Sequence, residues 1–259
     1  MTVSSPLSLR ARAALRLMSG FADAVLPCGC AVCGAAVRTP GSPVCQLCSS
    51  RITPVPPPWC PRCGLTRVLP APGPGLCSEC FGWSAAVRRA ASSCLHQGAA
   101  AELVRGLKYR GWTGLVELMA GLMLPAARRV AEGTVPVLVP VPLSAAKKRE
   151  RGFNQAELLA RAISRNTGWR VSELLRRSRS GPALVHLGRR QRERAATGAY
   201  TLDRRATDPF ERLPPVVIVD DVITTGATGA ACAEALEAAG ATCLGIVSFC
   251  RTDPLAGST

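Results

Sequence analysis

The chain has 259 residues, of which 47% are hydrophobic, and it carries a formal net charge of +15. This length allows one large domain or two small ones with a real core, and the apolar content excludes an intrinsically disordered chain. The charge favours polyanionic partners such as nucleic acids, phosphates or an anionic surface. An arginine-rich composition would give the same charge without a defined binding site, so both interpretations stay open.

Residues 1–27 mix three arginines with leucines and a phenylalanine, and they predict an amphipathic helix that packs on the body of the protein. They lack the unbroken apolar centre and the small-residue cleavage site of a signal peptide. The chain has no run of 18 or more apolar residues, so we predict no membrane span. We expect a cytoplasmic protein.

Eight of the 13 cysteines form four Cys-x-x-Cys pairs. The pairs are Cys30/Cys33, Cys45/Cys48, Cys60/Cys63 and Cys77/Cys80. Each pair predicts a tight turn whose thiolates point to one side, and two such turns complete a tetrahedral shell of four sulfurs. The spacing therefore predicts a double zinc ribbon over residues 28–84, with one or two structural zinc ions. Metal would supply on the order of 10 kcal/mol of folding energy per site, because this proline-rich segment has little apolar material.

Disulfides, an iron–sulfur cluster and redox-active dithiols are the alternatives to zinc. A cytosolic setting argues against structural disulfides, and four regular pairs argue against a single redox motif. Joining the first pair to the second and the third to the fourth is the simplest arrangement, but an interleaved one fits the same spacing. Cys28 lies beside Cys30 and could compete for the first site. The other cysteines are expected to be small core residues: Cys94, Cys232, Cys243 and Cys250.

From about residue 85 the pattern changes to apolar strands that alternate with helices. The predicted strands lie at 85–95, 135–142, 216–221 and 241–250, with weaker candidates at 169–178 and 196–202. The predicted helices lie at 99–111, 115–131, 154–168 and 226–240. Asn154 is expected to cap its helix, and Gly168 to follow the helix end. This alternation predicts an α/β domain over 85–259 with a parallel sheet covered on both faces, and ligands bound beyond the carboxyl ends of the strands.

The stretch VVIVDDVITTGATGA at residues 216–230 predicts a sugar-phosphate site. A buried strand runs into Asp220 and Asp221, and hydroxyl residues follow at the start of a helix, where free N–H groups and the helix dipole favour a phosphate. The two carboxylates must face something else, such as ribose hydroxyls or a divalent cation. The proposed phosphate contacts are Thr224, Thr225, Gly226, Ala227 and Thr228. The alternative is an acidic strand end followed by a threonine-capped helix.

The stretch VVIVDDVITTGAT closely resembles the phosphoribosyl-pyrophosphate (PRPP) motif of type I phosphoribosyltransferases. Together with the cysteine pairs, LKYRG at 107–111 and PVPLSAAKKRERGFNQAELLA at 140–160, it makes the chain similar to the ComF family, named for a late-competence DNA-uptake operon. The resemblance spans nearly the whole chain. It implies a type I phosphoribosyltransferase fold after the zinc-ribbon module, Mg²⁺ with PRPP or a nucleotide as ligands, and single-stranded DNA or a competence helicase-type protein as partners.

The resemblance also implies residue roles by position. Asp220 and Asp221 would bind the ribose hydroxyls, and 224–228 the 5′-phosphate. The pyrophosphate would be held by a loop that supplies Lys147, Lys148, Arg149 and Arg151. The implied catalytic set is Asp220, Asp221, Arg151 and Lys108. A mobile loop would close over the pyrophosphate with Arg189, Arg190, Arg192 and Arg194. Three residues after Arg192 the family usually has an asparagine, whereas this chain has Ala195, which removes the hydrogen bond that an asparagine would supply.

Three functions are compatible with these features. The first is a phosphoribosyltransferase, in which a nitrogen nucleophile attacks the ribose as pyrophosphate leaves, without a general base. The second is a nucleic-acid-binding accessory protein that binds PRPP or a nucleotide as a regulator, although the ribbon has few aromatic residues for base stacking. The third, ordinary purine salvage, lacks a familiar base-binding hood. His96 and His186 are expected to have non-catalytic surface roles.

Overall fold

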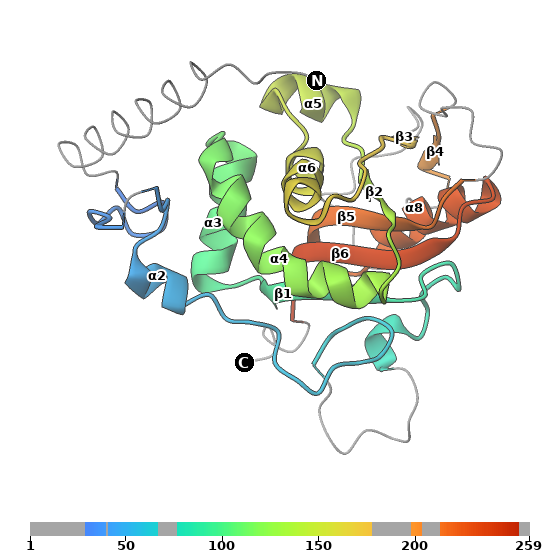
Figure 1. Ribbon diagram of the computed structural model, residues 1–259, viewed down its shortest axis with the longest axis horizontal. Coiled ribbons are helices and arrows are strands. Elements are labelled where there is room, and N and C mark those ends of the chain that lie inside the picture. Colours follow the sequence, from blue (N-terminus) through green and yellow to red (C-terminus); the bar gives the residue numbers. More distant parts are fainter. Residues whose placement is uncertain (1–28, 40, 67–76, 178–197, 204–212, 254–259) are drawn as a thin grey trace, which may run out of the picture. The chain divides into compact units, whose positions relative to one another are not determined.

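A computed structural model describes residues 29–39, 41–66, 77–177, 198–203 and 213–253 (Figure 1). The helix predicted over 1–27 lies outside these residues. The chain divides into two compact units, Met1–Ile52 and Thr53–Thr259. The cysteines of the first two Cys-x-x-Cys pairs belong to the smaller unit. Those of the last two pairs belong to the larger unit, which also contains the sheet. The predicted division at 84/85 stays a prediction.

The larger unit is built on a four-stranded sheet in the order β1–β6–β5–β2, and each neighbouring pair of strands is parallel. The strands are β1 (Ala90–Leu95), β2 (Val137–Pro140), β5 (Val216–Ile223) and β6 (Cys243–Arg251). The central position of β5 explains its continuous apolar run, because Val216 to Val219 are fully buried on both faces. The predicted α/β fold with a parallel sheet is therefore confirmed.

Helices cover both faces of this sheet. Among the described residues of the larger unit, the helices are α3 (Gly98–Tyr109), α4 (Val116–Ala131), α5 (Ala145–Arg151), α6 (Gln155–Thr167) and α8 (Ala227–Ala238). Helix α4 packs on β1 and β6 and crosses in front of the sheet in Figure 1, and α6 packs on β2 and β5. On the other face, Ile218 and Ile246 pack against Cys232 and Leu236 of α8. The short helices are α2 (Gln46–Ser50), η1 (Ser78–Cys80) and η2 (Thr113–Leu115).

The predicted boundaries of α6 are confirmed. The Asn154 side chain accepts a hydrogen bond from the Ala156 N–H at 3.1 Å and donates one to the Val141 carbonyl at 3.0 Å. Gly168 follows the last turn with φ of 74°, a left-handed conformation that glycine adopts without a Cβ penalty. The cap therefore fixes the start of α6 to the end of β2, where Gln155 enters the site.

Two local predictions need correction. The basic tract at 145–151 is a helix and not a loop, because Ser144 caps it and the alanines, lysines and arginines that follow favour a helix. Strand β5 continues past the aspartates to Ile223, which pairs with Arg251 of β6, so Asp220 and Asp221 lie inside the strand. The two weaker strand candidates are found over shorter ranges, as a separate antiparallel pair of β3 (Leu175–Arg177) with β4 (Tyr200–Leu202).

Within the described part of the chain, none of the helices combines the length and the apolar character needed to cross a membrane.

Candidate functional site

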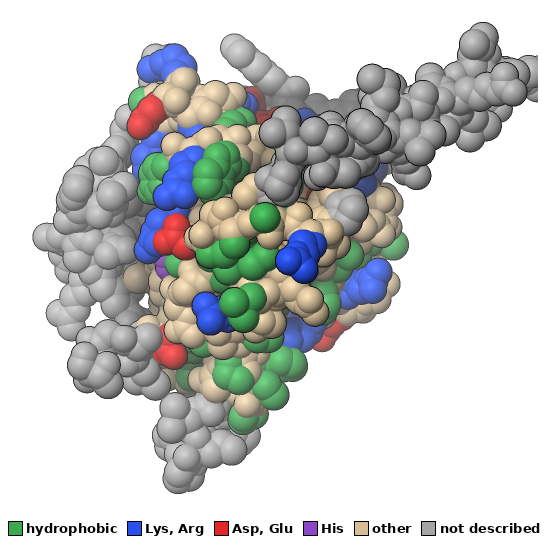
Figure 2. Space-filling model, turned by 90° about the vertical axis from the view of Figure 1, so that its left-hand side faces the viewer, with side chains coloured by type: hydrophobic (Ala, Val, Ile, Leu, Met, Phe, Trp, Pro, Cys, Tyr) green, Lys and Arg blue, Asp and Glu red, His purple; other side chains and the backbone are tan. Residues whose placement is uncertain are grey.

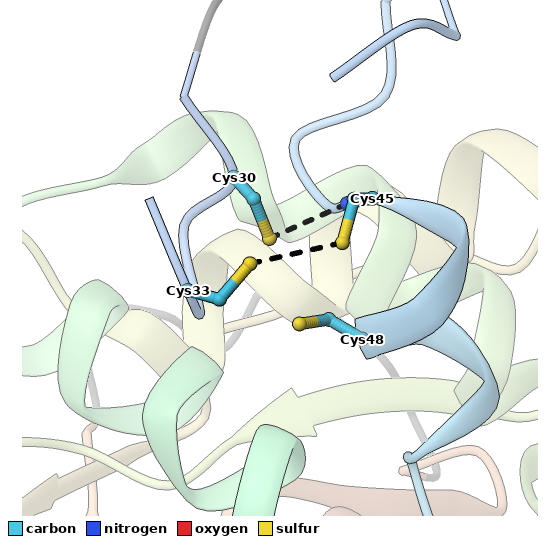
Figure 3. A group of neighbouring side chains, drawn as sticks. All are labelled: Cys30, Cys33, Cys45 and Cys48. Carbon is cyan, nitrogen blue, oxygen red and sulfur yellow. Dashed lines mark hydrogen bonds between the residues drawn. The ribbon is translucent and has the colours of Figure 1, made fainter. Parts of the chain in front are cut away.

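The paired cysteines gather into two separate groups of four sulfurs. The groups are Cys30, Cys33, Cys45 and Cys48, and Cys60, Cys63, Cys77 and Cys80. Within each group the Sγ atoms all lie within 4.8 Å of one another. The first pair is therefore joined to the second and the third to the fourth, and the interleaved arrangement is excluded. Figure 3 shows the four side chains of the first group converging from a turn and from the start of α2.

The sulfur spacing fits a zinc shell. A tetrahedral site with Zn–S bonds of about 2.3 Å places its sulfurs about 3.8 Å apart. The Sγ atoms of Cys33 and Cys45 lie 3.8 Å apart, and those of Cys60 and Cys80 lie 3.7 Å apart. Both groups could therefore hold a zinc ion with four thiolates and no open position, which is typical of a structural site. Cys28, the proposed competitor, lies outside the described residues.

Local backbone geometry prepares the first cysteine of each group for metal. Burial would raise the pKa of Cys30, but backbone N–H donors from Cys45, Cys33 and Val32 outweigh it and lower the pKa to about 6. Cys60 behaves in the same way, and backbone donors lower its pKa to about 6 despite burial. A thiolate is the form that binds zinc. Each group therefore has one thiolate at neutral pH before metal arrives.

In the larger unit, the three motifs that resemble the ComF family, at 107–111, 140–160 and 216–228, meet at β5. Lys108 Nζ lies 2.6 Å from Asp221 Oδ2, and the Gln155 amide donates to Asp221 Oδ1 at 3.4 Å. Arg151 donates to Gln155 Oε1 at 2.6 Å, and its guanidinium lies 5.6 Å from the ring centroid of Tyr109. The motifs at 107–111 and 140–160 are thus joined to the aspartates by direct contacts. Gln155 and Tyr109 received no role from the sequence, although both lie inside quoted motifs.

The two adjacent aspartates have opposite electrostatic roles. Burial, and then the charge of Asp221, raise the pKa of Asp220 well above its ordinary value. Burial would also raise the pKa of Asp221, but the charge and hydrogen bond of Lys108 lower it. The pKa of Lys108 is raised by Asp221 although burial opposes this. Without a ligand, Asp221 is therefore the carboxylate paired with Lys108, and the raised pKa of Asp220 favours the neutral form of that neighbouring carboxyl.

The predicted phosphate loop begins α8. Gly226 is the N-cap residue with φ of 82°, and the Thr225 hydroxyl accepts a hydrogen bond from the Ala227 N–H at 3.3 Å. A recess at this point is lined by residues that include Asp220, Thr224, Gly226 and Thr228. The structure therefore brings one of the aspartates together with the predicted phosphate contacts. This recess can accept an anion at the N–H groups and a hydroxyl or cation at the carboxyl.

The predicted pyrophosphate residues differ in their surroundings. Burial, and then the charges of Arg177 and Arg151, lower the pKa of Lys147, so these three cations lie close together. Lys148 instead reaches Glu157 and Glu173, each at 3.9 Å. Arg149 is exposed on α5. The arginines of the predicted mobile loop, and His186, lie outside the described residues.

Lys and Arg side chains are dispersed over the described surface in Figure 2, where they alternate with hydrophobic and acidic side chains. On this face the net charge is not gathered into one uniform basic patch. His96 is half-buried, and burial and then the charge of Lys108 lower its pKa. Its expected non-catalytic role stays a prediction.

Comparison with known proteins finds similar chains of nearly equal extent. The DNA utilization protein YhgH of Salmonella typhimurium is 32% identical over 230 residues, which cover 86% of this chain and 90% of that protein. YhgH of Escherichia coli K12 is 31% identical over 216 residues, covering 81% of this chain and 90% of that protein. The competence protein ComFC of Bacillus subtilis is 26% identical over 198 residues, covering 73% and 75%. No family model matches the chain.

Proposed function

Because this chain belongs to the ComF family of competence proteins, we propose that it acts in DNA uptake or in the use of incoming DNA, and that it binds PRPP with Mg²⁺ at the end of β5. The proposal rests on one observation above all. Asp220 shares a recess with Thr224, Gly226 and Thr228 at the start of α8. A carboxyl beside a ring of N–H and hydroxyl donors fits a sugar phosphate, whose hydroxyls and phosphate need opposite partners.

In this proposal the 5′-phosphate accepts hydrogen bonds from the backbone and hydroxyls of 224–228. Asp220 and Asp221 face the ribose hydroxyls, and Mg²⁺, when bound, neutralises part of the pyrophosphate charge. Lys147 and Arg151 supply fixed positive charge for the pyrophosphate, since their mutual repulsion is relieved by an anion. Gln155 holds Arg151 by its 2.6 Å hydrogen bond and so orients that guanidinium.

Transfer to a nitrogen acceptor would need little more from the chain. Positive charge develops at the ribose C1 as pyrophosphate leaves, and the carboxylates of Asp220 and Asp221 would stabilise it. The basic residues would hold the leaving group, and the loop would fix the ribose relative to the acceptor. The described side chains do not indicate a binding site for the nitrogen acceptor. Binding of PRPP is therefore the part of the proposal to test first.

Calorimetric titration of PRPP into the zinc-loaded full chain, with and without Mg²⁺, tests the site. We expect Mg²⁺-dependent binding that Asp220→Asn weakens by about 30- to 100-fold, the range for loss of one charge-assisted contact. Glu117→Gln is the control, because this exposed residue pairs with Arg165 on the surface. A folded wild-type protein that binds no PRPP would contradict the proposal.

A specific surface feature favours a second candidate, binding of single-stranded DNA. Beside Lys108, Tyr109 is 76% exposed and Trp112 is 38% exposed, and the Arg110 guanidinium lies 4.8 Å from the Trp112 ring centroid. Exposed rings next to arginines give bases a stacking surface and phosphates a counter-charge. A helicase-type competence protein is the partner that would deliver such a strand.

Binding of a fluorescent oligonucleotide measures this candidate function. Tyr109→Ala is expected to weaken binding by about 5- to 100-fold, because one base–aromatic stack contributes about 1–3 kcal/mol. Affinity should also fall steeply with salt. Phe81→Ala is the control, since Phe81 is an exposed aromatic of the ribbon that no arginine accompanies in the described contacts. Equal losses in both variants would remove the special role of Tyr109.

A further inference from the structure

The side chain of Trp83 connects the second tetracysteine group to the phosphate loop. Trp83 follows Cys80 by three residues, and its backbone N–H donates to the Cys80 carbonyl at 3.1 Å. Its indole leaves the ribbon, and Nε1 donates to the Thr225 carbonyl at 2.9 Å. The indole also packs against both the cysteine cluster and the main core beneath α8. A single side chain thus links two sites that are 142 residues apart in the chain.

The contact with the loop is close enough to determine the position of the loop. A Cβ added to Gly226 would lie 2.2 Å from Cζ2 of Trp83, which is far inside van der Waals contact. Gly226 also has φ of 82°, so glycine is required there both by the backbone and by the indole. The carbonyl before Gly226 accepts the indole N–H, and the glycine itself rests on the ring. The indole therefore forms the floor of the turn that starts α8.

Two arginines, the buried Arg251 and the half-buried Arg62, connect the indole to the second group of cysteines. The guanidinium of Arg251, the last residue of β6, lies 5.2 Å from the Trp83 ring centroid and donates to the Cys63 carbonyl at 3.1 Å. Arg62, between the third pair of cysteines, donates to four carbonyls along the turn that carries Trp83. The acceptors are Cys80, Trp83, Ser84 and Val87. The turn that carries Trp83 is therefore fixed by hydrogen bonds to the cysteine turn at 60–63.

The ribbon itself has few apolar contacts apart from its cysteines. Its hydrophobic cluster, in the described part of the chain, is Cys60, Cys63, Leu65 and Cys80, with Cys77 and Trp83 packed against it. Three of the sulfur–sulfur distances in this group are 3.4 to 3.7 Å, and all four sulfurs lie within 4.8 Å of one another, a spacing that a shared metal ion would explain. Such an ion bonds all four sulfurs, and without it the ribbon loses most of what closes the turns at 60–63 and 77–80.

We propose that Trp83 is a positioning residue through which metal binding at Cys60, Cys63, Cys77 and Cys80 controls the order of the loop at 224–228. Metal closes the ribbon, the closed ribbon holds the indole, and the indole holds the Thr225 carbonyl and Gly226. The link is reciprocal: an anion that orders the loop raises the affinity of the second tetracysteine group for metal. The anion part of this inference rests on the proposed function of the loop, whereas the order of the loop does not.

Hydrogen–deuterium exchange of the peptide spanning 222–230 tests the link without any ligand. In the zinc-loaded full chain, Trp83→Phe keeps an aromatic ring but removes the N–H donor. We expect its loop amides to exchange about 5-fold faster than in the wild type, the effect of losing one net hydrogen bond. Trp59→Phe is the matched control. Trp59 also donates from Nε1 to a backbone carbonyl, Val55 at 2.9 Å, and also lies under an arginine, Arg129 at 4.1 Å, but it does not contact the loop in these interactions.

A second measurement follows the metal. Zinc transfer from the second tetracysteine group to a coloured chelator should be slowed several-fold by PRPP with Mg²⁺ in the wild type and in Trp59→Phe, but not in Trp83→Phe. Equal loop exchange in the two tryptophan variants overturns the inference, whatever PRPP does. If instead Trp83→Phe loosens the loop while the wild type binds no PRPP, the link stands and the proposed function fails.

Discussion

Replacing Asp221 with asparagine is expected to lower the free energy of unfolding by about 2–3 kcal/mol, whereas the same change at Asp220 is expected to raise it by about 1 kcal/mol. Asp221 is 3% exposed and its Oδ2 lies 2.6 Å from Lys108 Nζ, so an asparagine leaves a largely buried ammonium without its counter-charge. Asp220 is a second carboxyl beside that ion pair. In the wild type the Asp221 N–H donates to Asp220 Oδ1 at 2.8 Å, and the side-chain oxygen of an asparagine can accept the same hydrogen bond. The substitution also removes a negative charge that burial and Asp221 disfavour.

The pH dependence of the two effects has opposite signs. The folded-state pKa of Asp221 is lowered, mainly by Lys108 against the effect of burial, so its contribution is present above the unfolded pKa of about 4 and is lost as pH falls through the folded pKa. The folded-state pKa of Asp220 is raised by burial and by Asp221, so the wild type loses stability as pH rises from about 4 to that raised value. The advantage of Asp220→Asn should therefore vanish near pH 4.

Urea unfolding of the wild type and both variants, from pH 4 to pH 8, measures these differences. Both variants are expected to weaken PRPP binding, so at Asp220 the effect on stability and the effect on binding would have opposite signs. A wild-type residue that lowers stability but is needed for ligand binding is typical of a functional site. A change of the same sign in both variants would show that the two carboxyls share their charge equally, contrary to the assignment of the ion to Asp221.

The sheet and its helices could be predicted from local patterns. The run at 216–219 and the proline-closed run at 135–142 are buried strands because a central parallel strand has no polar face. Asn154 and Gly168 mark the ends of α6 through contacts with their own neighbours. The cysteine spacing predicts the four pairs, since a Cys-x-x-Cys turn needs only four residues to form, whereas the structure was needed to show which pairs join. These features depend on interactions that lie close together in the chain.

The features that the sequence analysis did not predict depend on contacts between residues that are far apart in the chain, or on the surroundings of a segment in the fold. Strand β5 extends past its aspartates because β6 pairs with it as far as Arg251, and nothing local to β5 indicates this. The tract at 145–151 has the composition of a helix, but its charge and its similarity to a phosphate loop favoured a loop. The indole of Trp83 contacts a carbonyl 142 residues away. The opposite pKa shifts of the two adjacent aspartates depend on Lys108 of α3, which is distant from β5 in the sequence.

Replacing Cys63 with serine is expected to remove one zinc ion per chain and to lower the unfolding midpoint of the larger unit by about 10–20 °C, which corresponds to about half of the roughly 10 kcal/mol of a structural zinc site. Cys63 is fully buried in the second group, and its carbonyl is also the acceptor for Arg251. Loss of that metal therefore acts on the ribbon, on the indole and on the end of β6 together.

The matched variant is Cys33→Ser, which removes a ligand of the first group at an exposed position in the smaller unit. Metal analysis should find about two zinc ions per wild-type chain and about one in each variant, but only Cys63→Ser should shift the main unfolding transition and speed exchange at 222–230. An unchanged metal content in Cys63→Ser, or visible absorption from an iron–sulfur cluster in the wild type, would contradict the zinc assignment. Equal shifts in both variants would instead mean that the first group stabilises the larger unit as well. The contrast between the two cysteines thus separates a metal that only folds its own ribbon from one that also sets the phosphate loop.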